Sequence, residues 1–223
     1  MLSFYNIEGT EGAAILGKRL RDELSAGKRV LWLVCGGSSI PRAVEAMLDV
    51  PKELHAGLTI ALTDERYGPV GHEDSNWLQL SAAGFEPGDA RIIPTLQPDL
   101  SLAETAAAYA AAIEEALGNA DIVIAMFGIG ADGHIAGMLP GSPAVTEQAL
   151  ASGYDAGPFQ RITLTPPALR RIAAAYAFVY GDAKRQALET LQQQTLPLAT
   201  QPAQILKELP EAYIFNDQLG DTL

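Results

Sequence analysis

The stretch Arg29-Val-Leu-Trp-Leu-Val-Cys-Gly-Gly37 indicates the fold of this chain. Six consecutive apolar residues run from Val30 to Cys35 and end at two glycines. Comparable runs predict further strands at 58–63, 121–127, 161–165, 173–180 and 212–215. Strands that are apolar throughout, rather than alternating between apolar and polar residues, are typical of a parallel sheet covered by helices on both faces.

Helical patterns separate these strands. The spacing of apolar residues predicts helices over 10–25, 41–48, 101–117 and 182–191, and a further helix carrying Trp77 and Leu80. Ser101 and the Asp74-Ser75-Asn76 stretch are expected to cap two of them, while 142–160 is expected to be a loop. We therefore predict an α/β fold of three α/β/α layers with a mostly parallel, doubly wound sheet, forming a single domain over residues 1–223.

The composition excludes several classes of function. The chain has 15 Lys and Arg against 27 Asp and Glu, a formal charge of −12, which disfavours nucleic acid and anionic membrane surfaces as partners. Cys35 is the sole cysteine, so neither an intramolecular disulfide nor a cysteine-based zinc site is possible. The first residues lack a basic stretch followed by an apolar core, and no apolar run approaches the ~20 residues of a spanning helix. We expect a cytoplasmic protein; its oligomeric state is not indicated.

Ligands of such sheets bind beyond the carboxyl ends of the strands, so the residues that follow each strand are the candidates for a site. Gly36-Gly37-Ser38-Ser39-Ile40-Pro41 follows the first buried strand and leads into a helix. Glycine backbone, serine hydroxyls and a helix N-terminus suit a phosphate or carboxylate, although a tight turn with serine caps explains them equally well. The Gly-Lys-Ser/Thr ending of a nucleotide P-loop is missing.

The second strand ends in Asp64-Glu65-Arg66, and the third in a glycine loop that contains Asp132 and His134. Arg66 could bind an anion, or pair with Asp64 or Glu65. Gly128, Gly130 and Gly133 match the spacing of a dinucleotide-binding loop, but Pro140-Gly141 leaves no room for the helix that such a loop requires.

The charged residues and the histidine at these strand ends favour a catalytic role over a purely structural one. A neutral histidine can accept a proton near pH 7, and a neighbouring carboxylate can fix its tautomer. His134 and Asp132 are therefore candidate catalytic residues, although an isolated histidine is more often structural. Arg161 and Lys184, at two further strand ends, are either anion-binding residues or plain solvated cations.

Taken in order, these motifs resemble the 6-phosphogluconolactonases and the related glucosamine-6-phosphate deaminases. The resemblance rests on Gly-Gly-Ser-Ser, Thr-Asp-Glu-Arg-Tyr, the Gly128–Ser142 stretch, Arg-Ile-Thr-Leu-Thr and Gly-Asp-Ala-Lys, and runs from about 31 to 184. It implies no metal and no organic cofactor, and a sugar 6-phosphate as ligand. It implies that Gly37, Ser38, Ser39, Arg161 and Lys184 hold the phosphate and that Arg66 and His134 act near the sugar carbons, with Asp64 and Gly130 among the substrate-binding residues.

Two positions favour the lactonase branch. In the deaminases, the motif that resembles this stretch has a glutamate before the proline, whereas this chain has Leu139 before Pro140. The deaminases also tend to have a tyrosine at the position of Arg66. The expected reaction is hydrolysis of 6-phosphogluconolactone by water that His134 activates. A deaminase or related isomerase, and a sugar-phosphate sensor without turnover, are the alternatives. The Ser39-Ile40-Pro41 sequence carries one residue more than the usual lactonase loop, and the part after about 186 matches little.

Overall fold

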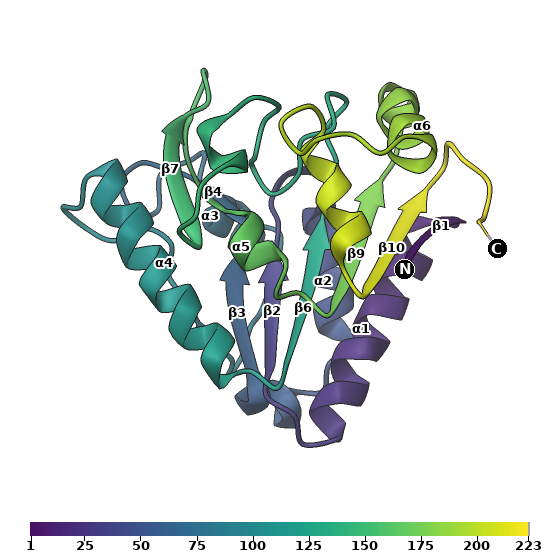
Figure 1. Cartoon of the computed structure of the whole chain (residues 1–223). Coiled ribbons are helices and arrows are strands. Elements are labelled where there is room, and N and C mark those ends of the chain that lie inside the picture. Colours follow the sequence, from purple (N-terminus) through teal and green to yellow (C-terminus); the bar gives the residue numbers. More distant parts are fainter. Residues whose placement is uncertain (223) are drawn as a thin grey trace.

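The computed structural model describes residues 1–222 and has a seven-stranded parallel sheet at its centre (Figure 1). The strand order is β1-β10-β9-β6-β2-β3-β5, and every neighbouring pair is parallel. The strands are β1 (Leu2–Asn6), β2 (Val30–Val34), β3 (Leu58–Leu62), β5 (Arg91–Ile92), β6 (Ile122–Phe127), β9 (Ala174–Val179) and β10 (Glu211–Asn216).

Helices cover both faces of this sheet, which confirms the predicted three layers. The helices are α1 (Gly9–Ser25), α2 (Ile40–Leu48), α3 (Asn76–Ala82), α4 (Leu102–Asn119), α5 (Pro166–Leu169) and α6 (Arg185–Gln193). On β2, Val30, Trp32 and Val34 pack in the core that contains α1, α2 and α3, while Leu31 and Leu33 pack in the core of α4, α5 and α6. Both faces of β2 are therefore buried, which is why its sequence shows no alternation.

A second sheet, antiparallel and three-stranded, stands above the carboxyl ends of the first. Its order is β4 (Asp64–Arg66), β8 (Gln160–Leu164), β7 (Ala151–Asp155). The prediction that 161–165 belongs to the parallel sheet is wrong, as is the prediction of a loop throughout 142–160. In β8 the burial rises along the strand: Gln160 is exposed and Arg161 half-buried, whereas Ile162, Thr163 and Leu164 are buried.

Most other predicted elements are confirmed to within a few residues. Ser75 caps α3, and Ser101 forms a capping box with Glu104 at the start of α4. The predicted helix at 182–191 begins as a 3-10 turn over 182–184 and continues as α6. Strands β1, β4, β5 and β7 were not predicted, because each is short or partly exposed. Among residues 1–222, none of the helices has the length and apolar character needed to cross a lipid bilayer.

The strand order fixes where a ligand can bind. From β2 the chain proceeds to β3 and β5 on one side, and from β6 to β9 and β10 on the other. The loops that follow β2 and β6 therefore diverge from two neighbouring strands, and such a topological switch point leaves a crevice at the carboxyl edge of the sheet. Figure 1 shows β4, β7 and α6 gathered at this same end.

The packing of α1 on α2 depends on Gly17. A Cβ atom there would lie 2.6 Å from the Cβ of Asp49 and 2.8 Å from the carbonyl oxygen of Ala46. We expect Gly17→Ala to destabilise the protein by about 1–3 kcal/mol, because the two helices would have to move apart. The measurement is the free energy of unfolding in urea.

Gly118→Ala in α4 is the matched control, since a Cβ there meets no atom within 4 Å. It is expected to stabilise the protein by up to about 1 kcal/mol through helix propensity. A loss of stability of similar size in both variants would contradict this account of the packing.

Candidate active site

A cleft of about 190 Å³ lies at the switch point between β2 and β6. All of the predicted site residues except Asp132 line it: Gly37, Ser38, Ser39, Asp64, Arg66, Gly130, His134, Arg161 and Lys184. They come from five separate segments of the chain, and the fold brings them together.

The loop after β2 forms one wall of the cleft. Gly36 is extended and packs so closely on Asn76 that a Cβ atom would lie 2.0 Å from the Asn76 Oδ1. Gly37 has a φ of +69°, a conformation that side chains rarely adopt. Gly37, Ser38 and Ser39 form a 3-10 turn that leads into α2 at Ile40. The amides of the turn and of the first turn of α2 suit an anion.

Cys35, which also lines the cleft, is not a nucleophile. Burial raises the pKa of its thiol to about 12, so the reactive thiolate is scarce near neutral pH.

Two arginines form the opposite wall. Arg66 of β4 and Arg161 of β8 are directly opposite each other in the antiparallel ladder. The Arg161 Nη1 lies 3.1 Å from the Asp64 Oδ2, and the Arg66 Nη1 donates to the carbonyl oxygen of Asp74 at 2.7 Å. In both arginines the buried Nε has no hydrogen-bond partner within residues 1–222. Two adjacent guanidinium groups with unused donors attract an anion.

Glu65 holds this wall in place. Its carboxylate is 1% exposed and accepts hydrogen bonds from the backbone N–H groups of Arg66, Asn76 and Trp77 and from the Ser75 hydroxyl. Burial raises the pKa of Glu65 although these donors oppose the shift. Glu65 thus fastens the start of α3 to β4 and does not pair with Arg66, one of the two pairings that the sequence left open.

The loop after β6 carries the histidine. The backbone N–H of Gly130 donates to the carbonyl oxygen of His134 at 3.0 Å, and Gly133 turns the chain with a φ of +80°. A Cβ atom on Gly130 would lie 2.0 Å from the His134 Nδ1. No helix follows within 128–142, which confirms the rejection of a dinucleotide-binding loop.

His134 and Asp132 form a hydrogen-bonded pair in this loop. The His134 Nδ1 lies 2.6 Å from the Asp132 Oδ1, which also accepts from the His134 backbone N–H at 3.1 Å. Partial burial would raise the pKa of Asp132, but the hydrogen bonds and the charge of His134 lower it below its usual value. Asp132 is therefore a carboxylate that accepts the Nδ1 proton. In the neutral ring this leaves Nε2 with a free lone pair, the state that a general base needs.

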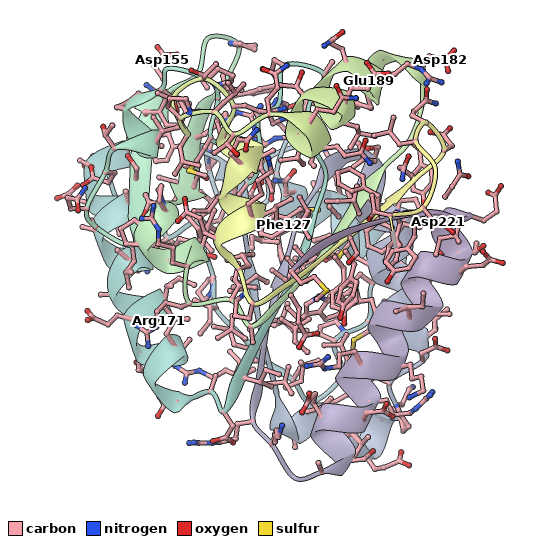
Figure 2. The ribbon with its side chains drawn as sticks, turned by 45° about the vertical axis from the view of Figure 1, so that its right-hand side comes forward. Phe127, Asp155, Arg171, Asp182, Glu189 and Asp221 are labelled. Atoms are coloured by element: carbon pink, nitrogen blue, oxygen red, sulfur yellow. The ribbon has the colours of Figure 1, made fainter. Side chains whose placement is uncertain are left out.

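Lys184 completes a positive cleft. It lies in the 3-10 turn before α6 and makes no ion pair with any of residues 1–222. Three cationic side chains, Arg66, Arg161 and Lys184, thus line the cleft with one carboxylate, that of Asp64. Two acidic residues of this end that Figure 2 labels, Asp155 and Asp182, are exposed. The protein is acidic overall while its cleft is cationic.

Sequence reasoning missed several residues that shape the cleft. Asn76 lines it and donates from Nδ2 to the Asp64 carbonyl oxygen at 2.8 Å; its sequence neighbours signalled a helix cap only. Gly137, with a φ of +73°, packs against the Asp64 side chain. The Tyr154 hydroxyl donates to the Gly137 carbonyl oxygen at 2.6 Å, and no sequence signal marks it. Among residues 1–222, no group of three or more His, Cys, Asp or Glu side chains is placed to hold a metal ion.

The chain is similar to known proteins over most of its length. A 6-phosphogluconolactonase of Pseudomonas aeruginosa is 30% identical over 77% of this chain and 75% of that protein. A crystal structure of a 6-phosphogluconolactonase from Shewanella baltica has a TM-score of 0.77 at 20% identity, covering 97% of this chain and 98% of the other. A monomeric glucosamine-6-phosphate deaminase also has a TM-score of 0.77, at 17% identity, covering 96% and 97% of the two chains. The fold is thus shared by both kinds of enzyme.

The family model described as glucosamine-6-phosphate isomerases/6-phosphogluconolactonase matches residues 10–214. This match includes every strand of both sheets except β1 and the end of β10, and all residues of the cleft. The chain belongs to the glucosamine-6-phosphate isomerase/6-phosphogluconolactonase family.

Proposed function

We propose that the protein hydrolyses 6-phospho-D-glucono-1,5-lactone to 6-phosphogluconate. The observation that carries the proposal is the Asp132–His134 pair, which presents a free Nε2 in a cleft that three cations line. The curated relatives with this name, one of them 30% identical, support the same reaction. A phosphate and a lactone carbonyl on one small sugar match an anion site beside a general base.

The phosphate binds, in this proposal, to the backbone of Gly37, Ser38 and Ser39 at the start of α2, together with Arg161 and Lys184. Each charge-assisted hydrogen bond contributes about 1.5–3 kcal/mol. Asp64 keeps the Arg161 guanidinium directed along the wall of the cleft through their 3.1 Å ion pair. Fixing the phosphate places the lactone carbonyl near His134, so that one water molecule can attack it.

In the first step His134 Nε2 removes a proton from water while the water oxygen forms a bond to C1 of the lactone. The π electrons of the carbonyl move to its oxygen and form an oxyanion. A positioned base of this kind contributes typically 10²–10⁴-fold to the rate. In the second step the oxyanion collapses, the bond between C1 and the ring oxygen breaks, and the His134 imidazolium returns its proton to that oxygen. The product is the open-chain acid, which ionises.

Arg66 is the proposed oxyanion donor. Two amides of the glycine loop are already engaged, because the N–H of Gly130 donates to the His134 carbonyl oxygen and that of Gly133 to the Gly130 carbonyl oxygen. Arg66 lines the cleft, and its guanidinium carbon lies 5.3 Å from the centroid of the Phe159 ring, a contact that holds the guanidinium in place. Gly130 contributes space for the histidine rather than a donor to the substrate.

The cleft fits lactone hydrolysis better than the deaminase reaction. Within residues 1–222, Asp64 is the one carboxylate that lines the cleft, and it is paired with Arg161. Leu139 occupies the position at which the resembling deaminase motif has a glutamate. The group that would move protons during ring opening is therefore replaced by an alkyl side chain. Hydrolysis of the lactone needs one base and one oxyanion donor, the roles that the proposal gives to His134 and Arg66.

The reaction can be tested with freshly prepared 6-phosphogluconolactone, by coupling the appearance of 6-phosphogluconate to its dehydrogenase. We expect formation of the product well above the spontaneous rate, and no ammonia from glucosamine 6-phosphate. Release of ammonia would assign the chain to the deaminase reaction. Binding of the sugar phosphate without acceleration would make it a sensor.

His134→Ala removes the proposed base without changing the cationic residues. We expect kcat to fall by about 10²–10⁴-fold, with KM changed little, because the phosphate contacts remain. Steady-state kinetics on the lactone measures both constants. A variant that retains near-normal kcat would remove His134 from the mechanism.

Lys184→Gln tests the phosphate site. Loss of one charge-assisted contact is expected to raise KM by roughly 10-fold or more, with a smaller effect on kcat. Lys52→Gln, which alters an exposed lysine far from the cleft, is the control and should behave as the unmodified protein. Equal KM values for the two variants would mean that Lys184 does not contact the substrate.

A further inference from the structure

The segment that follows α6 contains Gln201, a glutamine that is 4% exposed. Its Nε2 donates to the carbonyl oxygen of Ala187 at 2.8 Å. Ala187 lies in the first turn of α6, three residues after Lys184. One end of this side chain is therefore fastened to the helix that directly follows the cleft lysine.

The stem of Gln201 packs on the histidine loop. A Cβ atom on Gly133 would lie 2.5 Å from the Gln201 Cγ, so the two residues are in close contact. The backbone N–H of Ala203 donates to the Gly133 carbonyl oxygen at 3.0 Å. Because Gly133 stands between Asp132 and His134, this contact fixes the peptide that carries the catalytic pair.

The amide of Gln201 is held at both ends. Its Oε1 accepts a hydrogen bond from the Gln204 Nε2 at 2.7 Å, and the same Nε2 donates to the Gln194 carbonyl oxygen at 3.0 Å. Gln204 is itself 4% exposed. A buried amide with both its donor and its acceptor engaged has one orientation, since any rotation would leave buried polar atoms unpaired.

We propose that Gln201 is a positioning residue that sets the separation between Lys184 and the Asp132–His134 pair. The inference rests on the proposed function, in which Lys184 holds the phosphate and His134 activates water. Gln201 touches neither substrate nor reacting atoms; it joins the two parts of the chain that do. An error of about 1 Å in such a separation can cost up to 10²-fold in rate, because the carbonyl then lies out of reach of the activated water.

The test compares Gln201→Met with Gln186→Met. Both replace a glutamine by a side chain of similar length that lacks the amide, but Gln186 is exposed on the outside of α6, where it bonds to Thr190. We expect Gln201→Met to lower kcat and raise KM by roughly 10-fold together, and Gln186→Met to leave both unchanged. In a Lys184→Gln background the effect on KM should disappear, because the contact through which it acts is already lost.

Two readouts do not depend on turnover. The imidazole signals of His134 in NMR spectra are expected to shift or split in Gln201→Met, and the affinity for inorganic phosphate, followed by ³¹P NMR, should fall; neither should change in Gln186→Met. If the unmodified protein shows no lactonase activity, the proposed function fails while these two readouts still decide the role of Gln201.

Lower thermal stability of Gln201→Met with unchanged kcat, KM, His134 signals and phosphate affinity would overturn the proposal and leave a purely structural residue. If Gln201→Met does not fold, Gln204→Met replaces it; this variant removes the partner of the Gln201 Oε1 together with the hydrogen bond to the Gln194 carbonyl oxygen. In Gln204→Met we expect smaller changes of the same kind in kcat, KM, the His134 signals and the phosphate affinity. If all four were unchanged in that variant, the proposal would be overturned.

Discussion

The contact between Gly130 and the His134 ring is the constraint on which the site depends. The 2.6 Å hydrogen bond between the His134 Nδ1 and the Asp132 Oδ1 occupies space that any side chain at position 130 would fill. The loop therefore folds back on itself within five residues, and the amides of Gly130, Gly133 and His134 are used within it. Glycine is needed here to make room for the ring of His134, the proposed base, whereas in a dinucleotide-binding loop it brings the backbone to a pyrophosphate.

The rest of the fold places cations opposite that base. The chain leaves the parallel sheet after β3 and pairs with β8, which sets Arg66 beside Arg161 above the strand ends. Two like charges on facing residues would repel in isolation, and the Asp64 carboxylate offsets only part of that repulsion. An anion that binds in the cleft would offset the repulsion that remains between the two arginines. At physiological salt, charges on the outer surface are screened over ~8 Å, so the cleft and not the net charge of −12 governs a small phosphorylated ligand.

Much of this arrangement could be predicted from the sequence, because buried parallel strands and glycine-rich strand ends leave strong local signals. The runs at 30–35 and 121–127, and the residues that follow them, indicated both the layers and the place of the site. The second sheet could not be predicted, since β4 has three residues and its pairing with β8 spans almost a hundred positions. The burial of Glu65 and Gln201 was equally hidden, because residue type does not show which polar side chains the fold encloses.

The central claim is that the cleft has a phosphate end, at the start of α2 and Lys184, and a base end at His134. An experimental structure of the protein with 6-phosphogluconate bound tests it most directly. The account predicts the product carboxylate within about 3.2 Å of the His134 Nε2, and the phosphate on the Ser38 and Ser39 backbone and the Lys184 Nζ. The opposite orientation, with the phosphate at His134 and the carboxylate at the start of α2, would contradict it.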